Sequence, residues 1–318
     1  MATEVKIRQD TVAGWRGYRM EAGELTLGIV PQIGGRIMSL TQKGEELLFV
    51  QEQYRGQSID LSQIQDLAKE KKRLGFRVWG GDKTWVSPEE EWLEKIPPLD
   101  LDSGGYSCEV KDKKIEMVSP VCRETGLKII RQVELKDEQT VILNQTLINE
   151  SSKAQKRGIW NVTQLRRPWD VIWPATKDKV TPVHDEGLKE NADHKVTELF
   201  YSSTLKEGLT KIVCDDRTHF KFRAFISRGA VIALKRSKKG LISFTRHFDI
   251  NFDEDYPHND TVVEVYNAKD YEYLEIEVHG PLVELKPKGK VQHKQIWQIK
   301  RLSSEKDALD IQKILSVK

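Results

Sequence analysis

The sequence has few cysteines, no long apolar runs and no excess of either charge. Its three cysteines, Cys108, Cys122 and Cys214, lie far apart and form no CxxC pair, which favours ordinary thiols in a reducing compartment. No apolar stretch approaches the length of a membrane-spanning helix, and the first residues lack the apolar core of a secretory signal. We therefore expect a cytoplasmic protein that does not bind membranes.

The near-balance of charge, 51 basic against 49 acidic side chains, gives no broad basic field, so we expect no nucleic-acid partner. P-loop, GxGxxG and GxSxG motifs are absent, which argues against dinucleotide and nucleophilic-serine chemistry. No HExxH or closely spaced histidine pair occurs. His247 and His258 flank an acidic loop with Asp253 and Asp255, which leaves a metal site there as an alternative. Our prediction is no metal and no cofactor.

What the sequence does contain is many short segments with period-two alternation, separated by turns. Residues 3–55 have the pattern of a β-meander, and residues 128–148 that of a long hairpin. This pattern predicts an all-β fold, a large β-sandwich formed by residues 1–318 as a single domain. Two helices are expected, a short one near 58–73 and a C-terminal one over 304–317, while residues 174–200 are expected to be loop.

Residues 271–279 alternate clearly and form one candidate site. One face is mostly aliphatic and suits a core. The other carries rings, two carboxylates and an imidazole, namely Tyr271, Tyr273, Glu275, Glu277 and His279. Such a strand could form the floor of a site for a polar ligand. The alternative is a half-exposed strand whose acids are simply solvated.

Residues 75–92 form a second candidate site, with a pair of glycines beside charged and aromatic residues. Paired glycines let the backbone approach a ligand or another strand closely. Arg77, Asp82 and Lys83 could bind hydroxyl groups while Trp79 or Trp85 stacks on the face of a sugar. The alternative is a surface turn whose tryptophans fill the core.

Three segments together resemble the galactose mutarotase (aldose 1-epimerase) superfamily, and more closely an uncharacterised bacterial branch of it. Residues 34–40, with Gly44 and a Leu-Leu pair after it, resemble the N-terminal glycine-rich turn and hairpin. Residues 80–88 resemble the GG-x-K-x-W-x-x-P segment of that branch. Residues 274–297 resemble the final strand pair, in which a Leu-Glu-x-Gln segment carries the catalytic base. The resemblance implies a β-supersandwich that binds sugars.

The resemblance also implies a mechanism, in which a glutamate takes the proton of the anomeric hydroxyl while a histidine protonates the ring oxygen. Glu275 occupies the position of that base, and Glu277 the position of the glutamine. Leu165 stands where the family has its histidine. The candidate acids are therefore His247, His258 or Lys83.

The function expected from these residues is carbohydrate binding, with interconversion of anomers by Glu275 as the base, assisted by His247 or His258. The alternative is a non-catalytic saccharide-binding or regulatory protein on the same fold, with a lyase or hydrolase as a more distant third. The expected partner is a small sugar or oligosaccharide, held by a monomer or weak dimer. The expected substrate-binding residues are Arg36, Arg77, Asp82, Lys83, Trp85, Trp160, Thr163 and Glu277.

Overall fold

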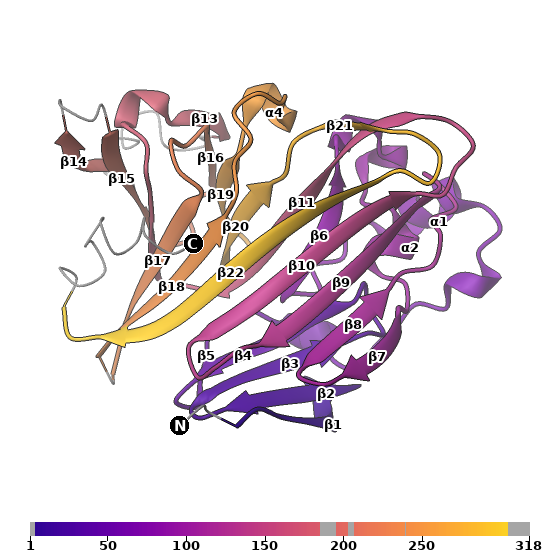
Figure 1. The fold of residues 1–318 in the computed structure, drawn as a ribbon, viewed down its shortest axis with the longest axis horizontal. Helices are drawn as coiled ribbons and strands as arrows, with labels where there is room; N and C mark the ends of the chain where they lie inside the picture. Colours follow the sequence, from indigo (N-terminus) through magenta and orange to yellow (C-terminus); the bar gives the residue numbers. More distant parts are fainter. Residues whose placement is uncertain (1–3, 185–194, 203–206, 239, 305–318) are drawn as a thin grey trace.

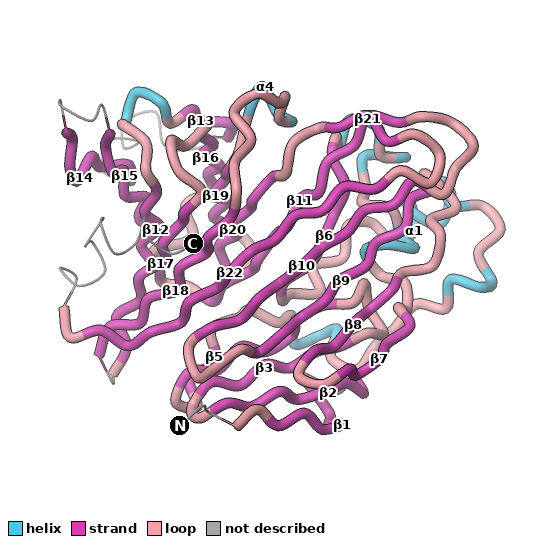
Figure 2. Tube along the Cα trace, viewed as in Figure 1, coloured by secondary structure: helices cyan, strands magenta, loops and turns pink. Residues whose placement is uncertain are grey.

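The computed structural model describes residues 4–184, 195–202, 207–238 and 240–304, and within them the chain forms two large antiparallel sheets. Buried side chains from both sheets pack into one core, so the sheets lie face to face; Figure 1 and Figure 2 trace their strands. The prediction of a large all-β sandwich is confirmed.

The first sheet has the strand order β1-β2-β3-β4-β6-β11-β20-β19-β16-β13, with β5 paired to β4 and β21 paired to β11. Its strands are β1 (Lys6–Val12), β2 (Trp15–Ala22), β3 (Leu25–Val30), β4 (Arg36–Gln42), β5 (Glu45–Glu46), β6 (Asp82–Ser87), β11 (Gln155–Arg166), β13 (Thr181–His184), β16 (Phe220–Ala224), β19 (Val263–Asn267), β20 (Tyr273–His279) and β21 (Val283–Leu285).

The second sheet has the order β14-β15-β12-β17-β18-β22-β10-β9-β8-β7. Its strands are β7 (Ser107–Lys111), β8 (Lys114–Val118), β9 (Leu127–Leu135), β10 (Thr140–Asn149), β12 (Trp169–Trp173), β14 (Val196–Ser202), β15 (Glu207–Cys214), β17 (Ala230–Ser237), β18 (Gly240–Phe248) and β22 (Lys290–Leu302).

The helices are short and lie in the connections. They are α1 (Leu67–Leu74), α2 (Leu99–Asp102) and α4 (Pro257–Asp260), with 3-10 turns η1 (Glu52–Tyr54), η2 (Leu61–Gln63), η3 (Glu89–Glu91), η4 (Leu93–Lys95) and η5 (Lys177–Lys179). The helix expected near 58–73 is present as η2 and α1. The helix expected over 304–317 lies, beyond Ser304, outside the described residues. No helix in the described ranges has both the length and the apolar character needed to cross a membrane.

Residues 174–200 are not all loop, because they include β13 and the start of β14. Both are edge strands, one in each sheet. Thr181, Pro182 and Val183 are exposed, so β13 shows no buried apolar alternation that a sequence pattern could reveal.

The core lies between the sheets, and the second sheet contributes to it by simple alternation. Every second side chain of β9 and β10 is buried against the first sheet, including Ile129, Val133 and Leu143, while the intervening ones are partly exposed. Strand β20 of the first sheet differs, because all of its side chains are buried. The half-exposed strand considered for residues 271–279 is therefore excluded.

A layer of polar side chains crosses this core and links the two sheets. Arg131 of β9 forms an ion pair with Asp82 of β6, and both side chains are fully buried. Arg246 of β18 donates to Thr163 Oγ1 at 3.0 Å, and also to Asn161 of β11. Because Arg131 and Arg246 each bond to groups on the first sheet, the layer joins one sheet to the other.

Candidate functional site

A cavity of about 360 Å³ lies on the outer face of the first sheet, the face turned away from the core. Strands β16, β19 and β20 supply its floor, and residues 76–97 supply much of its wall. Aromatic rings dominate the lining, namely Phe76, Trp85, Trp92, Trp160, Tyr266, Tyr271 and Tyr273. Such a concave, mostly apolar surface with a few polar groups is typical of a small-molecule site.

Strand register brings the polar groups of the site together. Lys221, Tyr266, Glu275 and Gln164 lie directly opposite one another on β16, β19, β20 and β11. Directly opposite residues of an antiparallel sheet point to the same face, so these four side chains form one row. The adjacent row on that face contains Glu264 and Glu277. Residues far apart in sequence thus become neighbours.

Glu275 is held through one of its two carboxylate oxygens. Its Oε1 accepts a hydrogen bond from Lys83 Nζ at 3.1 Å and another from Gln164 Nε2 at 2.8 Å. Its Oε2 makes no hydrogen bond within the described residues. Burial lowers the pKa of Lys83, whose ammonium also lies 4.2 Å from the centre of the Trp85 ring. The carboxylate is therefore oriented, with one oxygen left for a ligand.

Glu277 and Glu264 share one ammonium group. Lys221 Nζ lies 3.2 Å from Glu277 Oε2 and also contacts Glu264, while Trp160 Nε1 donates to Glu277 Oε2 at 2.9 Å. Burial raises the pKa of Glu277 well above its ordinary value. Burial also opposes the charge of Lys221, but Glu277 and Glu264 raise its pKa. Lys221 therefore stays charged and holds the two acids together.

His258 and His279 both approach Glu264 on the far side of the Trp160 ring. His258 Nδ1 lies 2.7 Å from Glu264 Oε1, and His279 Nε2 lies 3.7 Å from the same oxygen. The Trp160 ring centre is 5.1 Å from each imidazole. Although burial acts against its charge, Lys221 and the two imidazoles hold the pKa of Glu264 well below its usual range. Burial lowers the pKa of His279 to about 4.

The backbone that presents His258 is unusual. His258, Asn259 and Asp260 all have positive φ, at 53°, 59° and 64°, so α4 is a left-handed turn rather than a regular helix. A left-handed residue other than glycine costs roughly 1–2 kcal/mol. The turn is therefore maintained by its surroundings, which include the bond from Thr261 Oγ1 to the His258 carbonyl at 2.7 Å.

Three tryptophans form a rigid wall beside the two acids. The Trp92 and Trp160 rings are stacked with centres 5.5 Å apart, and Trp85 meets both of them edge-on. Trp85 Nε1 donates to Asp102 Oδ1 at 2.7 Å, which fixes its ring. Only a small part of each ring reaches the surface of the cavity, because all three are at least 93% buried.

Several residues expected at a site line the cavity, namely Tyr271, Tyr273, Glu275, Glu277, Trp85 and Trp160. Lys83 contacts the lining through its bond to Glu275, and His258 through the Trp160 ring. Asp82 and Thr163 lie instead in the polar layer of the core, where Thr163 Oγ1 donates to Asp82 Oδ2 at 2.7 Å. Side chains alternate along a strand, so Asp82 and its neighbour in sequence, Lys83, face opposite sides of the sheet.

The two arginines expected to hold a sugar also lie away from the cavity lining. Arg36 is buried against Asp102, with its Nη2 2.6 Å from Oδ1. The Arg77 guanidinium lies over the rings of Tyr54 and Trp79, at 5.2 and 5.6 Å from their centres. In these positions both arginines support the loops around the site.

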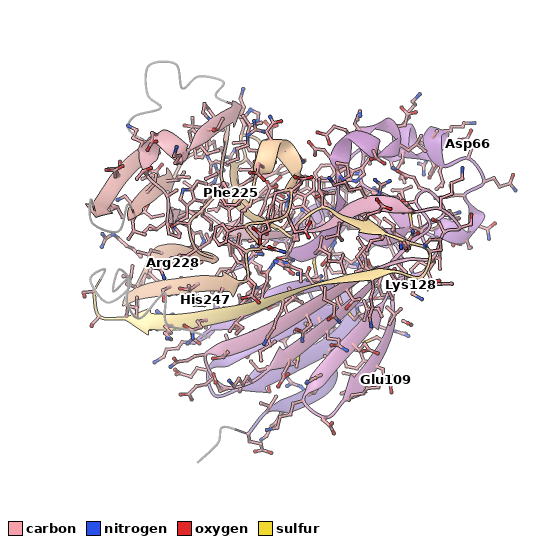
Figure 3. All side chains as sticks on the ribbon, turned by 45° about the horizontal axis from the view of Figure 1, so that its top comes forward. Asp66, Glu109, Lys128, Phe225, Arg228 and His247 are labelled. Carbon is pink, nitrogen blue, oxygen red and sulfur yellow. The ribbon has the colours of Figure 1, made fainter. Side chains whose placement is uncertain are left out.

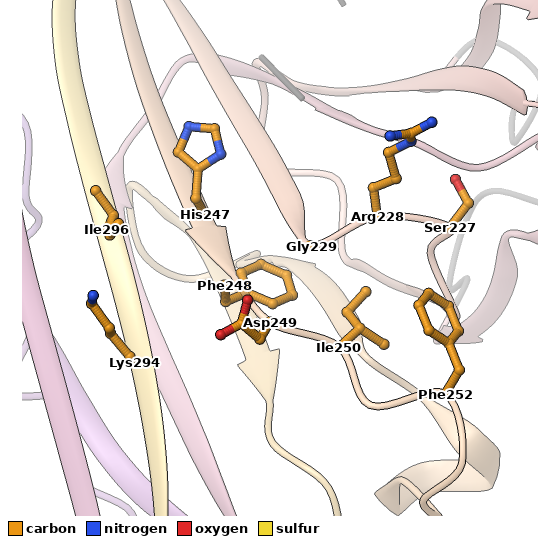
Figure 4. Close-up of a pocket in the computed structure, with 10 residues that line it drawn as sticks. All are labelled: Ser227, Arg228, Gly229, His247, Phe248, Asp249, Ile250, Phe252, Lys294 and Ile296. Carbon is orange, nitrogen blue, oxygen red and sulfur yellow. The ribbon is translucent and has the colours of Figure 1, made fainter. Parts of the chain in front are cut away.

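His247 belongs to a separate pocket of about 350 Å³ on the second sheet. It lies on β18 opposite Ile296 of β22, and Figure 3 shows it with Arg228. Arg228, Asp249 and Phe252 also line this pocket (Figure 4). Burial lowers the pKa of His247. The structure thus does not bring His247 together with Glu275. His258 lies near the cavity but behind Trp160, where it contacts Glu264.

Lys221 and Glu264 were not singled out from the sequence, although both are central to the site. Each lies on a strand with ordinary alternation, and neither belongs to a recognisable motif. The missing information is the pairing of β16 with β19 and of β19 with β20. A sequence pattern that predicts strands does not predict which strands are neighbours.

Residues 17–300 match the model of the family described as Domain of unknown function (DUF4380). The chain belongs to this family. No curated protein matches the sequence. The family thus gives no activity.

Several solved structures have a fold similar to that of this chain. A putative aldose 1-epimerase from Klebsiella pneumoniae aligns with a TM-score of 0.63 and 12% identity, over 98% of this chain and 88% of that one. A galactose mutarotase-like protein from Clostridium acetobutylicum aligns at 0.54 and 12%, covering 94% and 99%. Galactose 1-epimerase from Lactobacillus acidophilus aligns at 0.53 and 11%, also covering 94% and 99%. The chain therefore has the galactose mutarotase-like fold, which confirms the resemblance found in the sequence; identities this low concern the fold alone.

Proposed function

We propose that the protein binds a saccharide in the cavity on the outer face of the first sheet. The observation that carries the proposal is the combination of an aromatic lining with two buried acids on its floor, Glu275 and Glu277. Aromatic faces pack against the C–H faces of sugar rings, while carboxylates accept hydrogen bonds from hydroxyl groups. The volume of about 360 Å³ is near the small end of ligand pockets, which favours a monosaccharide or short oligosaccharide.

The polar groups are arranged for holding a neutral ligand. Glu275 offers its Oε2 to a hydroxyl group, because Lys83 and Gln164 take the other oxygen. Lys221, two strands from Glu275 in the same row, is a donor that is already paired with Glu277 and Glu264. Donors and acceptors are therefore both present without a strong net charge, which suits hydroxyl groups better than a phosphate or a carboxylate.

A titration of tryptophan fluorescence tests this proposal, since three tryptophans line the cavity. Purified protein is titrated with a panel of aldoses and short oligosaccharides, and binding is confirmed by calorimetry. Phe76→Ala removes an aromatic ring that lines the cavity but is 45% exposed, so stability changes little. We expect it to weaken binding by about ten-fold, the effect of losing roughly 1.4 kcal/mol.

Phe252→Ala is the matched control, because Phe252 is 61% exposed and lines the separate pocket with His247. It is expected to bind sugars as the natural chain does. The proposal fails if no sugar in the panel binds, or if the two variants lose affinity equally.

A second candidate function is the interconversion of sugar anomers with Glu275 as the base. The observation that favours it is the orientation of Glu275, whose Oε2 is left without a partner in the described residues while Oε1 is held by two donors. A positioned base of this kind can remove a hydroxyl proton. The reaction also needs a proton donor, and the raised pKa of Lys221 makes its ammonium a weak acid. Binding is therefore the first proposal and catalysis the second.

The NMR signals of freshly dissolved aldose anomers separate the two functions. Catalysis predicts faster equilibration with the natural chain and loss of that acceleration in Glu275→Gln, which keeps the size of the side chain. Binding alone predicts a measurable affinity with no acceleration in either protein. Acceleration that persists in the variant would remove Glu275 from the role of base.

A further inference from the structure

Three side chains that belong to no sequence motif form a cluster beside the Trp160 ring. They are His258 from the left-handed turn α4, Glu264 from β19 and His279 from the end of β20. One ligand-type atom from each lies within 4.8 Å of the others. Glu264 Oε1 is the shared point, at 2.7 Å from His258 Nδ1 and 3.7 Å from His279 Nε2.

The cluster is buried, and several of its ring nitrogens have no hydrogen-bond partner within the described residues. The His279 side chain is fully buried, yet neither of its ring nitrogens makes a hydrogen bond within the described residues. His258 Nε2 is likewise buried without a hydrogen-bond partner there. Buried polar atoms without partners are uncommon in folded proteins, and a bound ion or water molecule is one explanation for them. The unpartnered imidazole of His279 points to a ligand that the protein atoms alone do not supply.

We propose that His258, Glu264 and His279 form a binding site for a divalent transition-metal ion, most suitably Zn²⁺. Two imidazoles and one carboxylate are a ligand set that Zn²⁺ accepts, with metal–ligand distances near 2.0–2.2 Å. Those distances separate neighbouring ligand atoms of a tetrahedral site by about 3.4 Å. The observed 2.7 and 3.7 Å fall on either side of that value, so small rotations of the two rings would complete the geometry.

The surroundings of the cluster fit a cation. Lys221 occupies the other oxygen of Glu264, which leaves Oε1 for the ion and fixes the orientation of the carboxylate. The same ammonium also faces Glu277 at 3.2 Å, so one positive charge meets two acids. Trp160, with its ring 5.1 Å from both imidazoles, would shield the ion from the cavity.

Acidic groups at the surface lie beside His258. Its Nε2 lies 3.9 Å from Glu89 Oε1, and the Glu89 side chain is 46% exposed. Glu89, Glu90 and His258 also lie close enough together for their ligand atoms to approach one ion. A cation attracted from solvent by these outer acids would lie next to the buried cluster.

The test starts from protein freed of metal with a chelator and then titrated with Co²⁺, a coloured substitute for Zn²⁺. We expect visible absorption typical of low-symmetry cobalt coordination, saturation at one ion per chain, and loss of the colour when Zn²⁺ is added. Elemental analysis of the chain purified without a chelator gives a second, independent readout of bound metal.

His279→Gln is expected to weaken cobalt binding at least ten-fold. Because His279 is buried, that variant could fail to fold. His258→Gln, nearer the surface, therefore serves as the second test, and circular dichroism checks the fold of both variants.

His247→Gln is the matched control, a largely buried histidine outside the cluster. Asp253→Asn controls for the exposed acidic loop. Cobalt binding that is absent, or that His258→Gln and His247→Gln reduce equally, would overturn the proposal. Sugar binding is measured separately, so either proposal can fail alone.

Discussion

Arg131 of β9 and Asp82 of β6 form an ion pair in which neither side chain is exposed to solvent. The pair joins the two sheets, and Asp82 also accepts hydrogen bonds from Asn161 at 3.0 Å and from Thr163 at 2.7 Å. Removing one partner of a buried pair leaves the other charge uncompensated. We expect Asp82→Ala to lower the free energy of unfolding by about 3–5 kcal/mol, measured by urea denaturation.

The control for that change is an exposed pair, Lys43 with Glu24, whose side chains are 43% and 60% exposed. Glu24→Ala should alter stability by no more than about 0.5 kcal/mol, because solvent screens the interaction. Similar losses in the two variants would show that the buried pair has no special role.

Gly81 and Gly44 share the same backbone angle, φ +74°, but not the same surroundings. A Cβ at Gly81 would lie 2.4 Å from the Ile37 carbonyl oxygen, whereas a Cβ at Gly44 would meet nothing within 4 Å. We expect Gly44→Ala to cost about 1 kcal/mol, the effect of the left-handed angle alone. Gly81→Ala should cost clearly more, because the backbone must also move. Thermal unfolding of both variants measures the difference, and equal losses would contradict the steric argument.

Lys221→Met is expected to destabilise the chain strongly near neutral pH, since it leaves Glu264 and Glu277 buried without their shared cation. The loss should be about 3 kcal/mol or more. Lys221→Arg, which keeps the charge, should recover part of it. Because protonation removes the charge of the acids, the difference between natural chain and Lys221→Met should shrink as the pH falls toward 4. Chemical denaturation at several pH values checks this, and a difference independent of pH would count against it.

The burial of His293 should make the free energy of unfolding depend on pH. Burial, aided by the nearby charge of Arg246, lowers its pKa from an ordinary 6.5 to about 3. Between those values the unfolded chain binds a proton that the folded chain does not, so stability is complete above pH 6.5 and falls with decreasing pH. The contribution is about 1.4 kcal/mol per pH unit. The variant His293→Gln should show a shallower slope of unfolding free energy between pH 6.5 and 4. An unchanged slope would mean that His293 does not titrate with unfolding.

Residues 271–279 and residues 80–92 differ in how much of the site their sequence patterns predict. Alternation identified β20 and placed Glu275 and Glu277 on one face, and both line the cavity. The same rule separates Asp82 from Lys83, since neighbours along a strand face opposite sides. The prediction that Asp82 and Lys83 bind the same ligand does not agree with this alternation of faces. The ion pair that holds Asp82 in the core comes from Arg131, 49 residues away, and local patterns carry no information on such distant pairing.

The positions of other site residues also depend on strand pairing, which sequence patterns do not predict. Lys221, Glu264 and His258 meet only because β16, β19 and β20 are neighbours and the left-handed turn directs His258 inward. Histidine, asparagine and aspartate in succession are compatible with that turn but do not specify it. Edge strands such as β13 were missed for a different reason, because exposed polar strands resemble loops in composition.

The position of β22 has a consequence for how the protein is made. This strand, residues 290–302, lies in the middle of the second sheet, between β10 and β18. On the ribosome, β10 and β18 therefore emerge long before the strand that joins them. Until then each has an open edge of unpaired backbone groups, which is prone to pairing with other chains. The inter-sheet core also needs Trp297 and Ile299 from the same strand. We therefore expect chains stalled before residue 290 to depend on chaperones.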